Sequence, residues 1–275
     1  MHNNYPLHRF LTVCQEELAA TVIGMPYSSC TPLIRAFHET SPAEKFGDVC
    51  VQQLFQVTDR IVVRTGIPFT YLRDGRHLTG VANVHGTMVV IDPYLSHLEP
   101  IVFLEKSDQE ETTVRVPAAP FVEDHKGELR VGFVEATWLP AKGLLHIAQI
   151  KWSGSKRTYQ VSRKFSLSFS NSVDRALTGF DYRPFLFHPE QTSLSVRYID
   201  PNSLAYLEAR LPLEAEGKIE YRVNSSPLSR DLESWFWSII SRYGRTDRLE
   251  IESYIRRAEL CYSENKQAWE QDSYE

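Results

Sequence analysis

Apolar residues return every three or four positions in several stretches of the chain, which is the spacing of one helix face. Two such stretches, 7–23 and 50–64, lie in the first quarter of the chain, and 31–37 fits a shorter helix between them. Two more, 228–243 and a stretch that starts at about 247, lie near the C-terminus. The pattern therefore predicts helices at both ends of the chain and a different kind of structure between them.

The middle of the chain is rich in β-branched and aromatic residues that partly alternate with polar ones, which is typical of strands. Short polar turns join these segments, so the strands are expected to pair antiparallel. An aromatic-rich loop, 180–187, interrupts them and is expected to cover either the core or a pocket. The expected strands lie near 101–104, 112–116, 129–138, 144–152, 158–169, 193–199, 205–211 and 218–223.

The pattern as a whole predicts an α+β fold. An N-terminal helical region comes first, with a Cys-bearing helix packed on an antiparallel sheet, and a β-barrel-like region and C-terminal helices follow. We expect three consecutive regions, 1–103, 104–225 and 226–275, that work as one catalytic unit. Ser226-Pro227 supplies a cap and a first-turn proline for the first C-terminal helix, and the polar tail after Glu264 is expected to fray.

Charge and cysteine usage exclude several classes of function. The net charge of −5 gives no electrostatic reason to expect nucleic acid or an anionic membrane as a partner. The cysteines have no CxxC spacing and no Cys/His metal pattern, so no metal site is expected. No segment is apolar enough to span a bilayer, and the N-terminus is too polar for a signal peptide. A reducing, cytoplasmic location is the resulting prediction.

Cys50 lies at the predicted start of the second long helix. Asp48 is a good N-cap residue, with Val49 and Cys50 as the first helical residues, and Gly66 stands where a C-cap glycine is expected. A thiol in the first turn faces unpaired backbone N–H groups and the positive end of the helix dipole, which favours the thiolate. Cys50 is therefore a candidate nucleophile, although a cysteine at such a position is more often a small buried hydrophobe.

Two short hairpins follow this helix. Residues 69–73, 76–84 and 87–92 are expected to form strands, joined by two-residue turns at Asp74-Gly75 and His85-Gly86. The chain would then run back and forth as an antiparallel sheet beside the cysteine helix.

This layout places a histidine beside an aspartate. If the turn at His85-Gly86 has two residues, Thr79 faces Asp92 on the next strand. His77 and Asp92 then share one face as diagonal neighbours, about 7–8 Å apart at Cα, whereas a loop one residue longer would place them on opposite faces. The carboxylate can fix the imidazole tautomer, which is the third role in a set of nucleophile, base and orienting group.

Some of these assignments have simpler alternatives. His85 competes with His77 as the base, but a His-Gly dipeptide at a turn is most simply a turn with its side chain in solvent. Asp92 can instead begin a turn, as an Asp-Pro dipeptide often does. Cys14 and Cys261 lie on apolar helix faces and are expected in the core, while Cys30 lies in a loop where it could be exposed, with no base at a useful spacing.

A cysteine at a helix start, a histidine on a strand and an aspartate 15 residues further on resemble the arylamine N-acetyltransferases and the wider transglutaminase-like superfamily. Ile67-Pro68 and Asp92-Pro93 look transglutaminase-like, whereas Met25-Pro26-Tyr27 and the closing hairpin look like the acetyltransferases. The acetyltransferases carry Arg-Gly-Gly-aromatic before the cysteine, where this chain has Phe46-Gly47-Asp48-Val49, and Val-Gly-Phe-Gly after the aspartate, where it has Pro93-Tyr94-Leu95. The resemblance covers about residues 20–100.

The resemblance implies a cysteine-dependent acyltransferase with Cys50 as nucleophile, His77 as base and Asp92 as orienting group. It implies a thioester donor, either acyl-CoA or an acyl carrier protein, a small-molecule amine or hydroxyl acceptor, and no permanently bound cofactor. Two alternatives stay open: a transglutaminase-like amide hydrolase, crosslinker or peptide cyclase, and a non-catalytic relative that uses the cleft for binding. The intact set of three side chains argues against the last, and the modest size with a β-rich second half favours the first.

Overall fold

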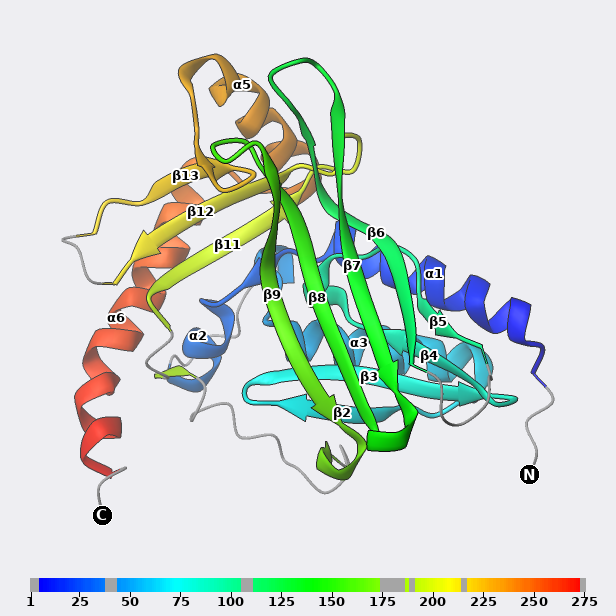
Figure 1. Ribbon diagram of the computed structural model, residues 1–275. Coiled ribbons are helices and arrows are strands. Elements are labelled where there is room, and N and C mark those ends of the chain that lie inside the picture. Colours follow the sequence, from blue (N-terminus) through cyan, green and yellow to red (C-terminus); the bar gives the residue numbers. More distant parts are fainter. Residues whose placement is uncertain are drawn as a thin grey trace. The chain divides into compact units, whose positions relative to one another are not determined.

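A computed structural model describes residues 5–37, 44–104, 111–173, 186–187, 191–213 and 217–272, with side chains up to residue 266. Within these residues the chain forms five α-helices and three antiparallel sheets, so the fold is α+β (Figure 1). None of the three sheets closes into a barrel in the described part of the chain, and the barrel-like middle region is not confirmed. None of the described helices combines the length and the apolar character that a bilayer-spanning segment needs.

The backbone packs into two compact units, and each is discontinuous in sequence. The first contains Met1–Gly24 and Cys50–Gly179, and the second contains Met25–Val49 and Phe180–Glu275. Cys50 is therefore the first residue after the chain returns to the first unit. The sequence pattern divided the chain after residues 103 and 225, whereas the packing groups it differently.

The first unit consists of two helices and two sheets. The helices are α1 (Leu7–Gly24) and α3 (Cys50–Thr65). One sheet has short strands and is called the smaller sheet below. Its strands pair in the order β10-β2-β3-β4-β5, with β10 at Ser172–Val173, β2 at Thr70–Asp74, β3 at His77–Val84, β4 at Thr87–Ile91 and β5 at Ile101–Phe103. The second sheet is a meander of β6 (Thr112–Glu123), β7 (Leu129–Leu139), β8 (Leu144–Ser153) and β9 (Thr158–Ser168).

The two sheets of the first unit share one apolar core, and α3 covers the other face of the smaller sheet. Leu72, Val81 and Val90 from the smaller sheet pack in one cluster with Val134 and Leu145 from the meander. Figure 1 shows the long green strands β6–β9 in front of the cyan strands β2–β4. Such layering is the usual way to bury both faces of a sheet.

Helix α3 lies close to β3 because β3 has a glycine at the contact. A Cβ atom on Gly80 would lie 3.2 Å from side-chain atoms of Leu54 and of Thr58 on α3. The helix buries the apolar stripe that the sequence predicted, and Gly66 ends it with a left-handed φ of 72° while its N–H donates to the Val62 carbonyl at 2.7 Å. The close approach of α3 to β3 thus depends on the absence of a side chain at position 80.

The hairpins confirm one predicted turn and correct the other. Val84 pairs with Thr87, so His85-Gly86 is a two-residue turn, and both residues have the positive φ values, 51° and 82°, that a type I′ turn requires. At the first turn, Asp74 pairs with His77. The two turn residues are therefore Gly75 and Arg76, one position later than the prediction, because Asp74 continues the ladder.

The second unit combines a sheet with three helices. The strands pair in the order β1-β11-β12-β13-β14, with β1 at Tyr27–Ser28, β11 at Ser193–Ile199, β12 at Tyr206–Pro212, β13 at Glu220–Val223 and β14 at Ser226–Pro227. The helices are α2 (Thr31–Phe37), α5 (Arg230–Ile239), which continues into a π-helical turn at Ile240–Gly244, and α6 (Arg248–Asp272). A continuous apolar cluster joins α2, α5 and α6 to β11 and β12.

One prediction for the second unit was wrong. Ser226-Pro227 does not cap a helix: it pairs with Arg222 and Val223 as strand β14, and α5 begins at Arg230 after the N-cap Ser229. The described backbone after Glu264 stays helical as far as Asp272, and the expected fraying of this tail stays a prediction.

Candidate functional site

The segment that leads into α3 is held by a close contact between two backbone stretches of the second unit. Gly47 has a φ of 70°, and a Cβ on it would lie 1.7 Å from the carbonyl oxygen of Pro26. The Asp48 N–H donates to the same oxygen at 3.1 Å, and the Ser28 N–H donates to the Asp48 carbonyl at 3.0 Å. Only glycine fits at position 47, and the contact brings together the Pro26 and Gly47 segments that the sequence analysis singled out.

Asp48 acts on the backbone before Cys50 rather than on the first turn of the helix. The helix begins at Cys50, one residue later than predicted, and Asp48 Oδ1 accepts from the Val49 N–H at 2.9 Å. Its Oδ2 pairs with Arg35 of α2. Burial raises the pKa of Asp48, and the bond and charge of Arg35 offset part of this rise.

His77 and Asp92 lie together at the end of β4, as the hairpin register predicted. The His77 Nε2–H donates to Asp92 Oδ2 at 2.7 Å, and the exposed fractions of the two side chains are only 4% and 1%. The Thr79 hydroxyl donates to the same Oδ2, also at 2.7 Å. A carboxylate with two donors on one oxygen is well placed to fix an imidazole tautomer.

The electrostatics of His77 link it to Cys50. Burial alone would lower the pKa of His77, but the charge and hydrogen bond of Asp92, with smaller contributions from a side-chain hydrogen bond and the charge of Cys50, raise it from 6.5 to about 10. Cys50 is partly exposed. The imidazolium is therefore the favoured form of His77 near neutral pH.

Among the described residues, His77 Nδ1 has no hydrogen-bond partner of good geometry. Because Nε2 already faces Asp92, Nδ1 is the ring nitrogen that is left for the Cys50 thiol. Catalytic hydrogen bonds are often long in proteins without substrate. The order of the three side chains is thus sulfur, imidazole and carboxylate.

Aromatic rings enclose the imidazole on one side. The Phe165 ring of β9 stacks on His77 with centroids 3.8 Å apart, and Tyr94 lies with its centroid 5.4 Å away. Arg163 donates to the Tyr94 hydroxyl at 2.9 Å. An aromatic face favours a cation above it, so Phe165 supports the imidazolium form.

The competing histidine and cysteines lie elsewhere. His85 is exposed in its turn and its Nε2 contacts the Tyr5 carbonyl at 3.1 Å. Cys14 and Cys261 are buried, as expected, but Cys30 is also buried, which corrects the expectation that it could be exposed. Most of the 180–187 loop lies outside the described residues; Phe187 is buried in the apolar cluster of the second unit.

Three neighbours of the site were not singled out as functional from the sequence. Thr79 could have been found, because the register already placed it opposite Asp92. His97, whose Nε2 accepts from the Asp92 N–H at 3.1 Å, lies five residues beyond Asp92 in a turn that no periodicity predicts. Phe165 comes from another sheet, and only tertiary packing brings it to His77.

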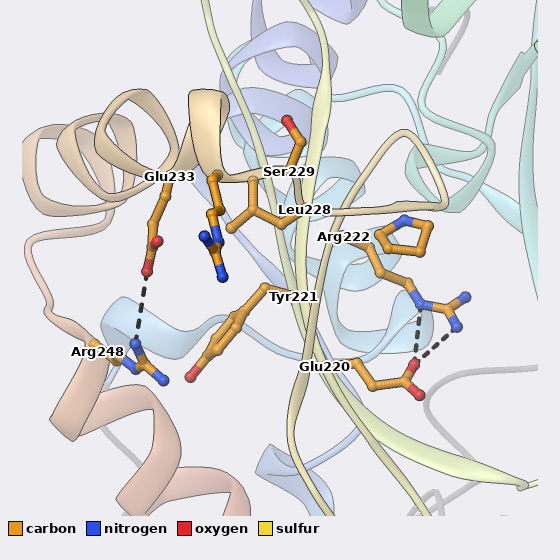
Figure 2. A pocket seen from close by; sticks show the side chains of 9 residues that line it. Glu220, Tyr221, Arg222, Leu228, Ser229, Glu233 and Arg248 are labelled. Atoms are coloured by element: carbon orange, nitrogen blue, oxygen red, sulfur yellow. Dashed lines mark hydrogen bonds and ion pairs between the residues drawn. The ribbon is translucent and has the colours of Figure 1, made fainter.

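The described surface also has hollows away from these residues. One of about 390 Å³ in the second unit is lined by residues of β13, α5 and α6, and Figure 2 shows its side chains. Glu233 pairs with Arg248 there at 3.7 Å, and Glu220 pairs with Arg222 at 2.8 Å. Both acidic side chains are thus matched by arginines, and the hollow contains none of the three candidate catalytic residues.

No family model matches the chain, and a comparison with curated proteins finds no similar sequence. The likeness to the acetyltransferases and transglutaminase-like proteins therefore depends on the residues of this chain alone and stays a prediction.

Proposed function

We propose that the protein is a cysteine-dependent acyltransferase with Cys50 as nucleophile, His77 as acid and base, and Asp92 as orienting group. One observation carries the proposal: a buried His77–Asp92 pair lies beside a partly exposed cysteine at a helix start, and the pKa of His77 is raised to about 10. An imidazolium next to a thiol is the arrangement in which the thiolate is stabilised as a nucleophile.

In the first half-reaction the Cys50 thiolate attacks the carbonyl carbon of an acyl thioester. The bond from that carbon to the donor sulfur breaks, and the donor thiolate leaves with the proton of the His77 imidazolium. The backbone N–H groups at the start of α3 are suited to hold the oxyanion. The acyl group is then linked to Cys50 as a thioester, and His77 is neutral.

In the second half-reaction an acceptor amine attacks the Cys50 thioester. His77 takes the proton of the attacking nitrogen, the carbon–sulfur bond to Cys50 breaks, and an amide leaves. Cys50 returns to the thiolate beside an imidazolium. The pair thus starts each cycle in the same protonation state.

The choice of donor follows from the chemistry of the nucleophile. Transfer of an acyl group from a thioester to another thiol is nearly thermoneutral, because one thioester bond breaks and one forms. An acyl-CoA or an acyl carrier protein therefore suits a thiol better than an unactivated ester does. A small amine or alcohol would be the acceptor, and no tightly bound cofactor is required. A peptide amide as donor, with water or a peptide amine as acceptor, would give the transglutaminase-like hydrolase, crosslinker or cyclase instead.

Intact-protein mass spectrometry with radiolabelled acetyl-CoA tests the proposal. The protein should gain one acetyl group, Cys50→Ala should gain none, and Cys261→Ala, which removes a buried thiol, should be acylated like the wild type. Adding an amine should release the label as an amide. Absence of any Cys50 adduct with acetyl-, longer-chain and carrier-protein thioesters would overturn the acyltransferase, and cleavage of a glutamine-containing peptide would favour the amide hydrolase.

A further inference from the structure

Asp92 lies where the sheet stops supporting the chain. The pairing of β3 with β4 ends at Gly80 and Ile91, and Asp92 is followed by the 3₁₀ turn Pro93–Leu95. Asp92 thus lies beyond the described end of this ladder, and its carbonyl accepts from the Leu95 N–H of the turn at 3.2 Å. Its Oδ1 is buried and has no partner among the described residues. Other groups must hold Asp92 in place.

His97 holds the backbone of Asp92. The ring is fully buried, its Nδ1–H donates to the Glu99 carbonyl at 2.6 Å, and its Nε2 accepts from the Asp92 N–H at 3.1 Å. Because the carbonyl accepts a hydrogen from Nδ1, Nε2 has no proton and acts as an acceptor. Burial lowers the pKa of His97, which agrees with a neutral ring.

Thr79 holds the carboxylate. Its hydroxyl is fully buried, donates to Asp92 Oδ2 at 2.7 Å and lies 3.3 Å from His77 Nε2. The hydroxyl and the imidazole thus converge on one oxygen, so rotation of the carboxylate would break two hydrogen bonds at once. A buried carboxylate loses much stabilisation when it loses a donor.

We propose that His97 and Thr79 are positioning residues, which hold Asp92 at its backbone N–H and at its carboxylate and so direct the carboxylate at His77. Neither side chain needs to touch the substrate. The inference depends on the proposed function for its catalytic consequence, but the placement of the carboxylate itself can be measured without any turnover.

Two matched pairs of variants test the inference. Thr79→Val removes the hydroxyl at nearly constant shape, and Thr79→Ser retains it. His97→Leu removes both hydrogen bonds, and His97→Gln offers an amide oxygen to the Asp92 N–H and an amide N–H to Glu99. The readouts are the NMR titration of the His77 ring, assigned with a His77→Gln variant because the chain has nine histidines, and kcat and KM for acyl transfer.

The expected result follows from the balance at His77. Burial lowers its pKa, and the charge and hydrogen bond of Asp92 are the largest contributions against burial. Thr79→Val and His97→Leu should therefore lower the pKa by about one unit or more, while Thr79→Ser and His97→Gln restore it. In Thr79→Val and in His97→Leu, kcat should also fall about tenfold or more, with KM nearly unchanged.

An unchanged titration in folded Thr79→Val would overturn the inference, whatever the activity. A fall in the pKa of His77 that the conservative variants do not reverse would also overturn it, because the fall would then not depend on the hydrogen bonds to Asp92. If His97→Leu does not fold, the Thr79 pair still decides. The titration shifts as predicted even in a protein that proves to have no acyltransferase activity, so failure of the proposed function and failure of this inference are distinguishable.

Discussion

The two units of the molecule each place a cysteine beside buried polar groups, but in different surroundings. In the first unit Cys50 is partly exposed at a helix start, next to an imidazole that Asp92 holds in its charged form. In the second unit Cys30 is fully buried in an apolar cluster, where the Cys30 N–H donates to the Ser28 hydroxyl at 3.2 Å and the thiol contacts the Ser195 carbonyl at 3.9 Å. Both thiols have hydrogen-bonding neighbours.

What differs is the charge that the surroundings can supply. Ser28 and a carbonyl provide no positive charge for a thiolate, and burial raises the pKa of Cys30 to about 12. His77 provides such a charge because a carboxylate stabilises it from the other side. A hydrogen-bonded cysteine becomes reactive only where the fold also provides a cation and access.

The largest expected effect is on thiol reactivity. Iodoacetamide at pH 7.5 should modify Cys50 at least about a hundredfold faster than Cys14 or Cys30, because burial encloses those two thiols and raises their pKa to about 12. Peptide mapping by mass spectrometry measures the rates. In denaturant all four cysteines should react alike, and equal rates in the folded protein would remove the contrast between the two units.

The second effect is on the pH dependence of stability. Asp92 raises the pKa of His77, so the imidazolium contributes stability that is fully present below about pH 6.5 and is lost as the pH rises through about 10. Asp92→Asn should therefore lower the free energy of unfolding more at pH 6.5 than at pH 10, by more than about 1.4 kcal/mol between the two. Urea unfolding at both pH values measures the difference.

Asp200 supplies the control for this pH effect. It is buried, and the Ser203 hydroxyl and the Asn202 amide donate to its carboxylate, so its described partners include no imidazole. Asp200→Asn should cost stability about equally at both pH values. If the loss of stability changed with pH by the same amount in both variants, the pH effect could not be assigned to His77.

A smaller effect is expected where α3 meets β3. Gly80→Ala places a Cβ 3.2 Å from side-chain atoms of Leu54 and Thr58, so these atoms must move by a few tenths of an ångström, and the free energy of unfolding should fall by about 1 kcal/mol. Gly154→Ala, which has no atom within 4 Å of the added Cβ, should be neutral or slightly stabilising. Thermal unfolding of the two variants measures the contrast, and equal stability would mean that the helix contact is loose.

The smallest effect is expected at the turn. His85→Asn should change the free energy of unfolding by less than about 0.5 kcal/mol, because asparagine also accepts the left-handed φ of 51°. Acylation of Cys50 should be unaffected, whereas His77→Gln should abolish it. A loss of acylation in His85→Asn would mean that His85, and not His77, is the base.

Local patterns predicted those parts of the structure that neighbours in sequence determine. The spacing of apolar residues predicted α2 over its whole length, and the His85-Gly86 turn predicted the register that brings His77 to Asp92. A two-residue turn leaves one pairing, so the face of every residue on the next strand follows from it.

Long-range contacts determine what the sequence patterns missed. Ser226-Pro227 looks like a helix cap, but β13 offers it a strand partner, and tertiary pairing outweighs the local preference. Cys30 looks exposed in its loop until Ser195, far along the chain, is placed beside it. Phe165 reaches His77 for the same reason, from a strand in a different sheet.

The pairing of β1 with β11 also sets an order of events during synthesis. Cys50, His77 and Asp92 are all synthesised before the second unit has its sheet, and the unit that contains them ends at Gly179. Ser28, in contrast, pairs with Val196, so at ordinary translation rates it waits roughly 10–30 s for its partner. A nascent chain stalled before β11 would therefore already contain every residue of the first unit, while Tyr27 and Ser28 would still lack the strand with which they pair.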